Sequence, residues 1–272
     1  MITTSSTLPN VAKIRTVTKA EAYELLQTAL DRFLTLVETL EPDDWEKPTA
    51  CTAWSVRDIL AHQAGGYASG TGYREMLRQG MRLPKRGQLI EDAINDFQLQ
   101  ERADHSPQEL IEELRRVGPV AAEKWAHQFQ LAKLIAIPHP IAGTLSFRYL
   151  MEITHSRDTW MHRLDICRAT GREFEQTQEH DGRIAELVML DVANILARKH
   201  ADLSLTFDLT GIAGGVWTIG KGEPVATIRM DVLDFNIFAS GRYSYKEARP
   251  LATITGDIAT AEKALKDILV LY

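Results

Sequence analysis

Residues 157–165 read RDTWMHRLD, which places a carboxylate and an imidazole one helical turn apart. A helix turns about 100° per residue, so residues four apart point to nearly the same side. Asp158 and His162 can therefore converge on one metal ion, although the spacing also suits a surface ion pair worth about 0.2–0.5 kcal/mol. His155 lies on the same stripe, and the sequence leaves open whether it replaces Asp158 as a ligand or supports a ligand by a hydrogen bond.

A third metal ligand is predicted on a second helix. Residues 54–62 read WSVRDILAH, with Ser55 as the expected N-cap and Asp58 closing a capping box. His62 lies at the border of the apolar face of this helix, which we expect to end near residues 65–66, a glycine pair. Two imidazoles and one carboxylate from two helices suit zinc or a harder divalent metal and leave positions open for water or substrate.

The first two thirds of the chain show helical periodicity. Further long helices are expected at residues 20–40, 106–125 and 145–169, with a loop or short helix within residues 70–90. Ser106 and Pro107 form a strong helix start, a kink is expected at Pro119, and Gly171 is expected to close the last of these helices. This part of the chain is therefore predicted to be a helical bundle.

The pattern changes after about residue 200. Residues 203–209 read LSLTFDL and alternate with period two, as a half-buried strand does. Further strands are expected at residues 214–219, 226–230 and 252–255, short helices near 231–240 and 258–270, and a linking helix at 183–199. The predicted fold class is therefore α plus α/β in two domains, a helical bundle over residues 1–180 and a small α+β domain over residues 181–272.

Composition excludes several classes of protein. The net charge of −6 argues against a nucleic-acid binder, which normally carries a basic surface. The two cysteines, Cys51 and Cys167, form no disulfide framework and fit a reducing cytoplasm. Residues 1–19 lack the apolar core of a signal peptide, and no apolar run approaches the length of a membrane span. We therefore expect a cytoplasmic protein.

Other candidate residues carry weaker signals. Asp165 follows His162 by three residues and either orients it or forms an exposed salt bridge with a neighbouring arginine. Cys167 is expected to be a small buried apolar side chain rather than a nucleophile. Arg242 offers a fixed positive charge that could hold a substrate carboxylate. No Gly-x-Ser-x-Gly elbow is present, so no serine-hydrolase constellation is predicted.

Three motifs, in order, resemble those of the mycothiol-dependent maleylpyruvate isomerase family, part of the DinB-like four-helix-bundle superfamily. Residues 44–62, DWEKPTACTAWSVRDILAH, resemble the start of the family's metal-binding domain, and residues 158–171 resemble its second metal motif. The tail, with GGVW at 214–217, SGR at 240–242 and TGD at 255–257, is similar to the family's C-terminal domain, a relative of sterol-carrier folds. The resemblance covers most of the chain.

The resemblance also implies a set of metal ligands. The family takes a histidine from the first motif and a Glu-x-x-x-His pair from the second. Carried over residue by residue, this gives His62, Asp158 and His162. The sequence departs from the family pattern at Asp158, where the best-known members have glutamate, so the shorter carboxylate must approach the metal differently or His155 must assist.

The activity implied by the resemblance is that of a metal-dependent isomerase or S-transferase. Such an enzyme uses a low-molecular-weight thiol such as mycothiol, takes zinc as the expected divalent metal, and acts on a small acidic or electrophilic substrate that Arg242 would hold. Two other classes are open: a non-catalytic protein that binds a metal and a small ligand, and a metal-dependent hydrolase. The expected partners are small molecules, with neither nucleic acid nor membrane, and the chain is expected to be a monomer or homodimer.

Overall fold

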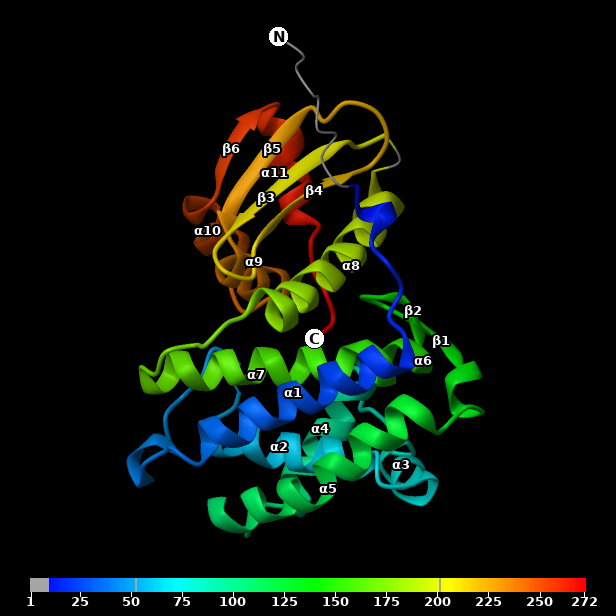
Figure 1. Cartoon of the computed structure of the whole chain (residues 1–272), viewed down its shortest axis with the longest axis vertical. Coiled ribbons are helices and arrows are strands. Elements are labelled where there is room, and N and C mark those ends of the chain that lie inside the picture. The colour runs from blue at the N-terminus through cyan, green and yellow to red at the C-terminus, as the bar shows by residue number, and fades with distance from the viewer. Residues whose placement is uncertain (1–9, 52, 201) are drawn as a thin grey trace. The chain divides into compact units, whose positions relative to one another are not determined.

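The computed structural model describes residues 10–51, 53–200 and 202–272 (Figure 1). Two parts of the sequence that carry predictions lie outside the described residues. They are residues 1–9, where no signal peptide is expected, and Thr52 of the first motif. The chain divides into two compact units. The bundle unit comprises Val17–Ile137 and Leu145–Phe174, and the sheet unit comprises Met1–Thr16, Pro138–Thr144 and Glu175–Tyr272.

The bundle unit is built from helices that surround one apolar core. Its helices are α1 (Lys19–Val37), α2 (Val56–Ser69), α3 (Tyr73–Gly80), α4 (Ile90–Glu101), α5 (Pro107–His127), α6 (Phe147–Tyr149) and α7 (His155–Thr170). Helix α1 packs on α5 and α7, and α2 packs on α4, α5 and α7. Leu30, Leu60, Leu114 and Ile166 are fully buried in this core, one from each of α1, α2, α5 and α7.

Local sequence signals explain where these helices begin and end. Ser55 and Ser106 each form a capping box with the acidic residue three positions on, as expected. Helix α6 continues into α7 through a π-helical turn at Leu150–Thr154. Gly171 closes α7 in the left-handed conformation, with φ of 72°.

One expectation about this unit was wrong, and one helix was not predicted. Helix α2 does not end at residues 65–66 but continues to Ser69. The reason is packing, because a Cβ on Gly65 would lie 2.6 Å from Cβ of Gln98. Gly65 therefore lets α4 approach α2 closely rather than ending the helix. Helix α4 had no counterpart among the expected helices, since its buried residues, Ala93 and Gln98, include a polar one.

The two adjacent glycines of α2 are predicted to respond to alanine in opposite ways. Gly66→Ala should stabilise the protein by about 0.5–1 kcal/mol, because the new Cβ meets no atom within 4 Å and alanine favours the helix. Gly65→Ala should destabilise it by about 1–3 kcal/mol, because Gln98 must move away. Urea denaturation measures both free energies of unfolding, and changes of the same sign would contradict the close packing of α2 on α4.

A buried ion pair joins the segment after α5 to the π-helical turn. Nζ of Lys133 lies 2.8 Å from Oε1 of Glu152, and the two side chains are only 2% and 9% exposed. The same ammonium donates a hydrogen bond to the carbonyl oxygen of Ala126 at 3.0 Å. These contacts compensate the cost of removing the Lys133 charge from water.

The sheet unit places a mixed four-stranded sheet against helices (Figure 1). Its strands are β3 (Leu205–Thr210), β4 (Gly215–Ile219), β5 (Ala226–Asp231) and β6 (Thr253–Gly256), in the order β4-β3-β5-β6. The central pair β3 and β5 is parallel, and both outer pairs are antiparallel. The helices are α8 (Arg183–Lys199), α9 (Val232–Ala239), α10 (Tyr245–Ala248) and α11 (Ile258–Lys266). Val188, Phe207, Ile228, Phe235 and Leu265 belong to its core.

Two shorter strands lie between α5 and α6 in the sequence. β1 (Ala136–His139) and β2 (Gly143–Ser146) pair as a two-stranded sheet. Among the described residues, no helix is long and apolar enough to cross a bilayer. The expected fold class, a helical bundle followed by a small α+β domain, is confirmed.

Candidate metal centre

The three ligand candidates converge inside the bundle unit. His62 comes from α2, and Asp158 and His162 come from α7. Nε2 of His62 lies 3.3 Å from Oδ2 of Asp158, and Nε2 of His162 lies 3.3 Å from Oδ1 of the same carboxylate. One ligand atom from each residue lies within 4.8 Å of the others. Ligands of a tetrahedral zinc ion at about 2.0–2.1 Å are themselves about 3.3 Å apart, so the distance from each imidazole to the carboxylate suits such an ion.

Burial distinguishes this cluster from a surface ion pair. His62 is 7% exposed and His162 is 4% exposed, so both imidazoles are removed from solvent. The side chain of Asp158 is 22% exposed, which makes it the most accessible of the three. Although aspartate is one methylene shorter than glutamate, its carboxylate reaches both imidazoles.

His162 is oriented by a carboxylate on its own helix. Nδ1 of His162 lies 3.1 Å from Oδ2 of Asp165, which is 1% exposed. Asp165 therefore orients the imidazole, and the alternative of an exposed salt bridge was wrong because the residue is buried. Because Asp165 accepts the Nδ1 proton, Nε2 is the nitrogen that can bind a metal once it loses its own proton, which is the arrangement that metal-binding histidines need.

His62 is held by two residues that sequence reasoning did not assign to the site. Nδ1 of His62 lies 2.9 Å from Oε1 of Gln98 on α4. The Trp54 ring lies beside both imidazoles, with centroid distances of 4.8 Å to His62 and 5.6 Å to His162. Trp54 stands inside the first motif, but no role was predicted for its ring. Gln98 carries no motif, and its one signal is a polar side chain on the buried face of a helix.

The Asp158 carboxylate is fixed by side chains from both helices. Gln63 donates a hydrogen bond to Oδ2 of Asp158 at 2.6 Å. Oε1 of Gln63 in turn accepts from the Thr159 hydroxyl at 2.8 Å. The Tyr67 hydroxyl lies 3.1 Å from Oγ1 of Thr159 and extends this buried network. The carboxylate is thereby positioned before any ligand arrives.

The charged groups of the cluster shift one another's pKa values. Burial raises the pKa of Asp158, but the charges of His162 and His62 outweigh this effect and hold the pKa well below its usual value. Burial lowers the pKa of His162, whereas the carboxylates of Asp158 and Asp165 raise it, with the net result a pKa of about 9. At neutral pH the metal-free site therefore contains an ionised Asp158 and a protonated His162.

This protonation predicts that metal affinity increases with pH. A cation must displace the proton on His162, so the apparent affinity should rise by about tenfold per pH unit and level off near pH 9, the pKa of His162. Competition against a chromophoric chelator at several pH values measures this slope. Asp165→Asn removes one of the charges that raise the pKa of His162, so the plateau should begin at lower pH. A flat profile in the wild-type protein would contradict this protonation state.

His155 lies outside the cluster of ligand atoms. Its ring stacks on Trp125, with centroids 3.8 Å apart and an interplanar angle of 8°. Burial lowers the pKa of His155 to about 4, so the ring is neutral at physiological pH. Among the described residues, the cluster that could hold an ion consists of His62, Asp158 and His162.

The two remaining candidate residues, Arg242 and Cys167, do not belong to the cluster of His62, Asp158 and His162. Arg242 follows α9 in the sheet unit and is half-buried. Cys167 is buried near the end of α7, and burial raises the pKa of its thiol to about 11. The thiol is therefore neutral at physiological pH, as expected of a buried apolar residue.

Known proteins resemble this chain in sequence pattern and in fold. A family model, the mycothiol maleylpyruvate isomerase N-terminal domain, matches residues 26–167, which include all three clustered residues. A crystal structure of the mycothiol-dependent maleylpyruvate isomerase superposes with a TM-score of 0.58 at 12% identity, and covers 92% of this chain and 98% of its own. A histidine-to-alanine mutant of that isomerase superposes with the same TM-score and coverage at 11% identity. At such identities the likeness shows the fold.

None of the curated proteins matches the sequence. The family model nevertheless spans more than half of the chain, from a point within α1 to the last turn of α7. The chain therefore belongs to the mycothiol maleylpyruvate isomerase N-terminal domain family.

Proposed function

We propose that this protein is a metal-dependent enzyme that uses a low-molecular-weight thiol, mycothiol or a related compound, to isomerise or S-alkylate a small electrophilic substrate. The observation that carries the proposal is the convergence of His62, Asp158 and His162 with Nε2 of both imidazoles turned toward one carboxylate. Two nitrogen ligands and one oxygen ligand suit zinc and leave a position open, as in catalytic rather than structural zinc sites.

The residues of the chain prepare this site in three ways. His62 and His162 offer Nε2, since Gln98 and Asp165 accept hydrogen bonds from Nδ1. Asp158 supplies a negative charge that offsets part of a cation's charge. When bound, the cation and the thiol would together supply a thiolate nucleophile for addition to an activated double bond or displacement of a leaving group.

Arg242 is proposed to hold an acidic substrate. This proposal rests on the family resemblance of residues 240–242 and on the planar, permanently charged guanidinium, which suits a carboxylate. Arg242→Lys should raise KM for an acidic substrate more than it lowers kcat, because a point charge replaces bidentate recognition. A substrate without a carboxylate should show no such change.

The thiol requirement is tested with the cobalt-substituted protein. Addition of mycothiol to the wild-type protein should produce a cobalt–thiolate charge-transfer band, and His62→Ala protein treated identically should show none. Glutathione and N-acetylcysteine in parallel titrations identify the physiological type of thiol. Full metal occupancy without a band for any thiol would overturn the proposal and favour a metal-dependent hydrolase or a non-catalytic binding protein.

A further inference from the structure

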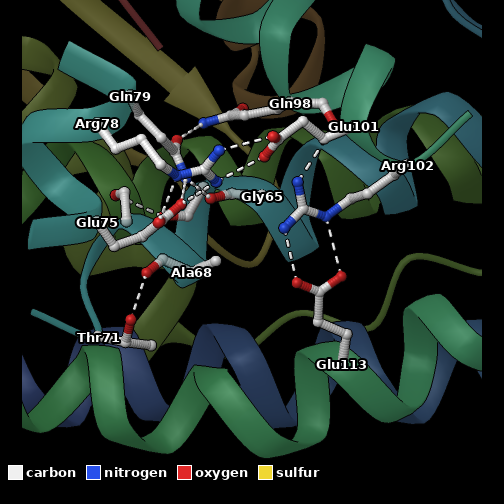
Figure 2. Close-up of polar contacts among 12 residues, drawn as sticks. Gly65, Ala68, Thr71, Glu75, Arg78, Gln79, Gln98, Glu101, Arg102 and Glu113 are labelled. Atoms are coloured by element: carbon white, nitrogen blue, oxygen red, sulfur yellow. Dashed lines mark hydrogen bonds and ion pairs between the residues drawn. The ribbon is translucent and has the colours of Figure 1, made fainter. Parts of the chain in front are cut away.

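A chain of buried side-chain amides leads from His62 to the surface of the bundle unit. Gln98 places Oε1 2.9 Å from Nδ1 of His62 and donates through Nε2 to Oε1 of Gln79 at 2.8 Å. Gln79 donates through Nε2 both to the carbonyl oxygen of Gly65 at 3.0 Å and to Oε1 of Glu75 at 2.9 Å. The two glutamines are only 3% and 2% exposed, and Figure 2 shows the amide nitrogen of Gln98 directed at the amide oxygen of Gln79.

The chemistry at the outer end fixes the direction of every hydrogen bond in this chain. A carboxylate and a backbone carbonyl only accept, so Gln79 must turn its amide nitrogen toward Glu75 and Gly65 and its oxygen toward Gln98. Gln98 must then turn its nitrogen toward Gln79 and its oxygen toward His62. An oxygen opposite Nδ1 of His62 requires a proton on that nitrogen. The direction therefore follows from the two acceptors and not from the assignment of amide atoms.

The outer acceptor is held in its charged form. Arg78 donates to both oxygens of Glu75 at 2.7 Å and also pairs with Glu101 (Figure 2). Arg78 keeps the pKa of Glu75 below its usual value. The carboxylate also faces a pocket of about 420 Å³, where water can solvate it.

A second ion pair fixes Gln98 itself. Arg102 binds both oxygens of Glu113 on α5, at 2.9 and 2.6 Å (Figure 2). Through Nη1, Arg102 also donates to the backbone carbonyl of Gln98 at 3.2 Å. This bidentate pair anchors α4 to α5 beside the residue that contacts His62.

The tautomer of His62 has to be fixed, because each of its two ring nitrogens faces a hydrogen-bond acceptor. Its Nε2 lies 3.3 Å from the charged Asp158, which draws a proton to the nitrogen that would bind metal. His162 meets the same problem with a carboxylate, Asp165, on its other side. Gln98 is uncharged and can present either its oxygen or its nitrogen, so it fixes a tautomer only if its own orientation is fixed.

We propose that Gln79 and Gln98 are positioning residues that transmit the acceptor-only character of Glu75 and of the Gly65 carbonyl to His62. They hold the imidazole in the Nδ1–H tautomer and keep the Nε2 lone pair available. The proposal concerns the same metal centre and rests on the proposed function, which requires His62 to keep Nε2 free for a metal. It adds α3 and α4, which supply no ligand, to the parts of the fold that prepare the site.

We refer to the hydrogen-bond chain from Glu75 through Gln79 and Gln98 to His62 as the relay. Gln79→Met tests it, because Gln79 bonds to Gln98 and not to the imidazole. The tautomer of His62 is read from the ring ¹⁵N chemical shifts of the metal-free protein, which distinguish a protonated from an unprotonated Nδ1. The wild-type protein should show the Nδ1–H form. Gln79→Met should show a substantial Nε2–H population, and its zinc affinity should fall by about 10- to 100-fold.

Two further variants separate the relay from a general structural effect. Adding Gln98→Glu to Gln79→Met should restore the Nδ1–H tautomer, because a carboxylate accepts whichever way it turns. Glu101→Gln is the matched control, since it weakens the Arg78 ion cluster but leaves the amide chain in place, and the tautomer should not change. If Gln79→Met does not fold, Gln98→Met and Gln98→Glu are compared directly.

The outcomes that would overturn the relay are specific. A wild-type Nε2–H tautomer would overturn it, as would an unchanged Nδ1–H tautomer in folded Gln79→Met or equal tautomer populations in Gln98→Met and Gln98→Glu. These spectra are recorded without metal or thiol. A wild-type protein that binds neither would therefore overturn the proposed function while leaving the tautomer result intact.

Discussion

His62→Ala should abolish stoichiometric metal binding. The free energy of zinc binding is about 10–16 kcal/mol in small zinc domains with four ligands, so one ligand accounts for about 2.5–4 kcal/mol, a factor of roughly 10² to 10³ in affinity. Metal analysis after dialysis against a chelator buffer should give about one ion per wild-type chain and less than about 0.1 per variant chain. Asp158→Ala should behave in the same way, since its carboxylate faces both imidazoles.

His155→Phe is the matched control for this prediction. Phenylalanine keeps an aromatic ring against Trp125 but offers no nitrogen ligand, so metal content should remain at the wild-type level. Circular dichroism confirms that each variant is folded. Full occupancy in His62→Ala would exclude the proposed site, and loss of metal in His155→Phe with retention in Asp158→Ala would make His155 the third ligand.

Glu152→Ala should strongly destabilise the bundle unit. It leaves the Lys133 ammonium buried without its carboxylate, and an uncompensated buried charge costs about 3–5 kcal/mol. The free energy of unfolding is measured by urea denaturation followed by tryptophan fluorescence. Fluorescence reports mainly on this unit, because Trp217 is the only one of the five tryptophans outside it.

Replacing both partners separates the charge from the packing. Lys133→Met combined with Glu152→Leu fills a similar volume without a buried charge, so the double variant should lose far less stability than Glu152→Ala. A Glu152→Ala protein as stable as the wild type would show that Lys133 finds water or another partner when the carboxylate is removed.

Much of the fold could be predicted because it is encoded locally. Helix α8 occupies residues 183–199 as expected, since its apolar periodicity is strong, and a π-helical turn at Gln178–Gly182 leads into it. Ser55 and Ser106 fix the starts of α2 and α5 through contacts within three residues. The alternation in residues 203–209 similarly gave β3 to within two residues at its start.

What could not be predicted depends on contacts between distant segments. Gly65 reads as a helix stop in isolation, and only the presence of α4 shows that it is a packing position. Gln98 lies 36 residues from His62, and no local pattern connects them. The i,i+4 spacing placed Asp158 beside His162, whereas Asp165 had two readings that only its burial could separate.

The π-helical turn at Leu150–Thr154 determines how this chain can tolerate a change in length before α7. A π turn completes one helical revolution with about one residue more than an α turn, so it takes up an extra residue without rotating the helical segments on either side. A single-residue deletion there would convert the π turn into an α turn while leaving α6, Asp158 and His162 in phase. Insertions and deletions upstream of α7 can thus be absorbed before they reach the ligands.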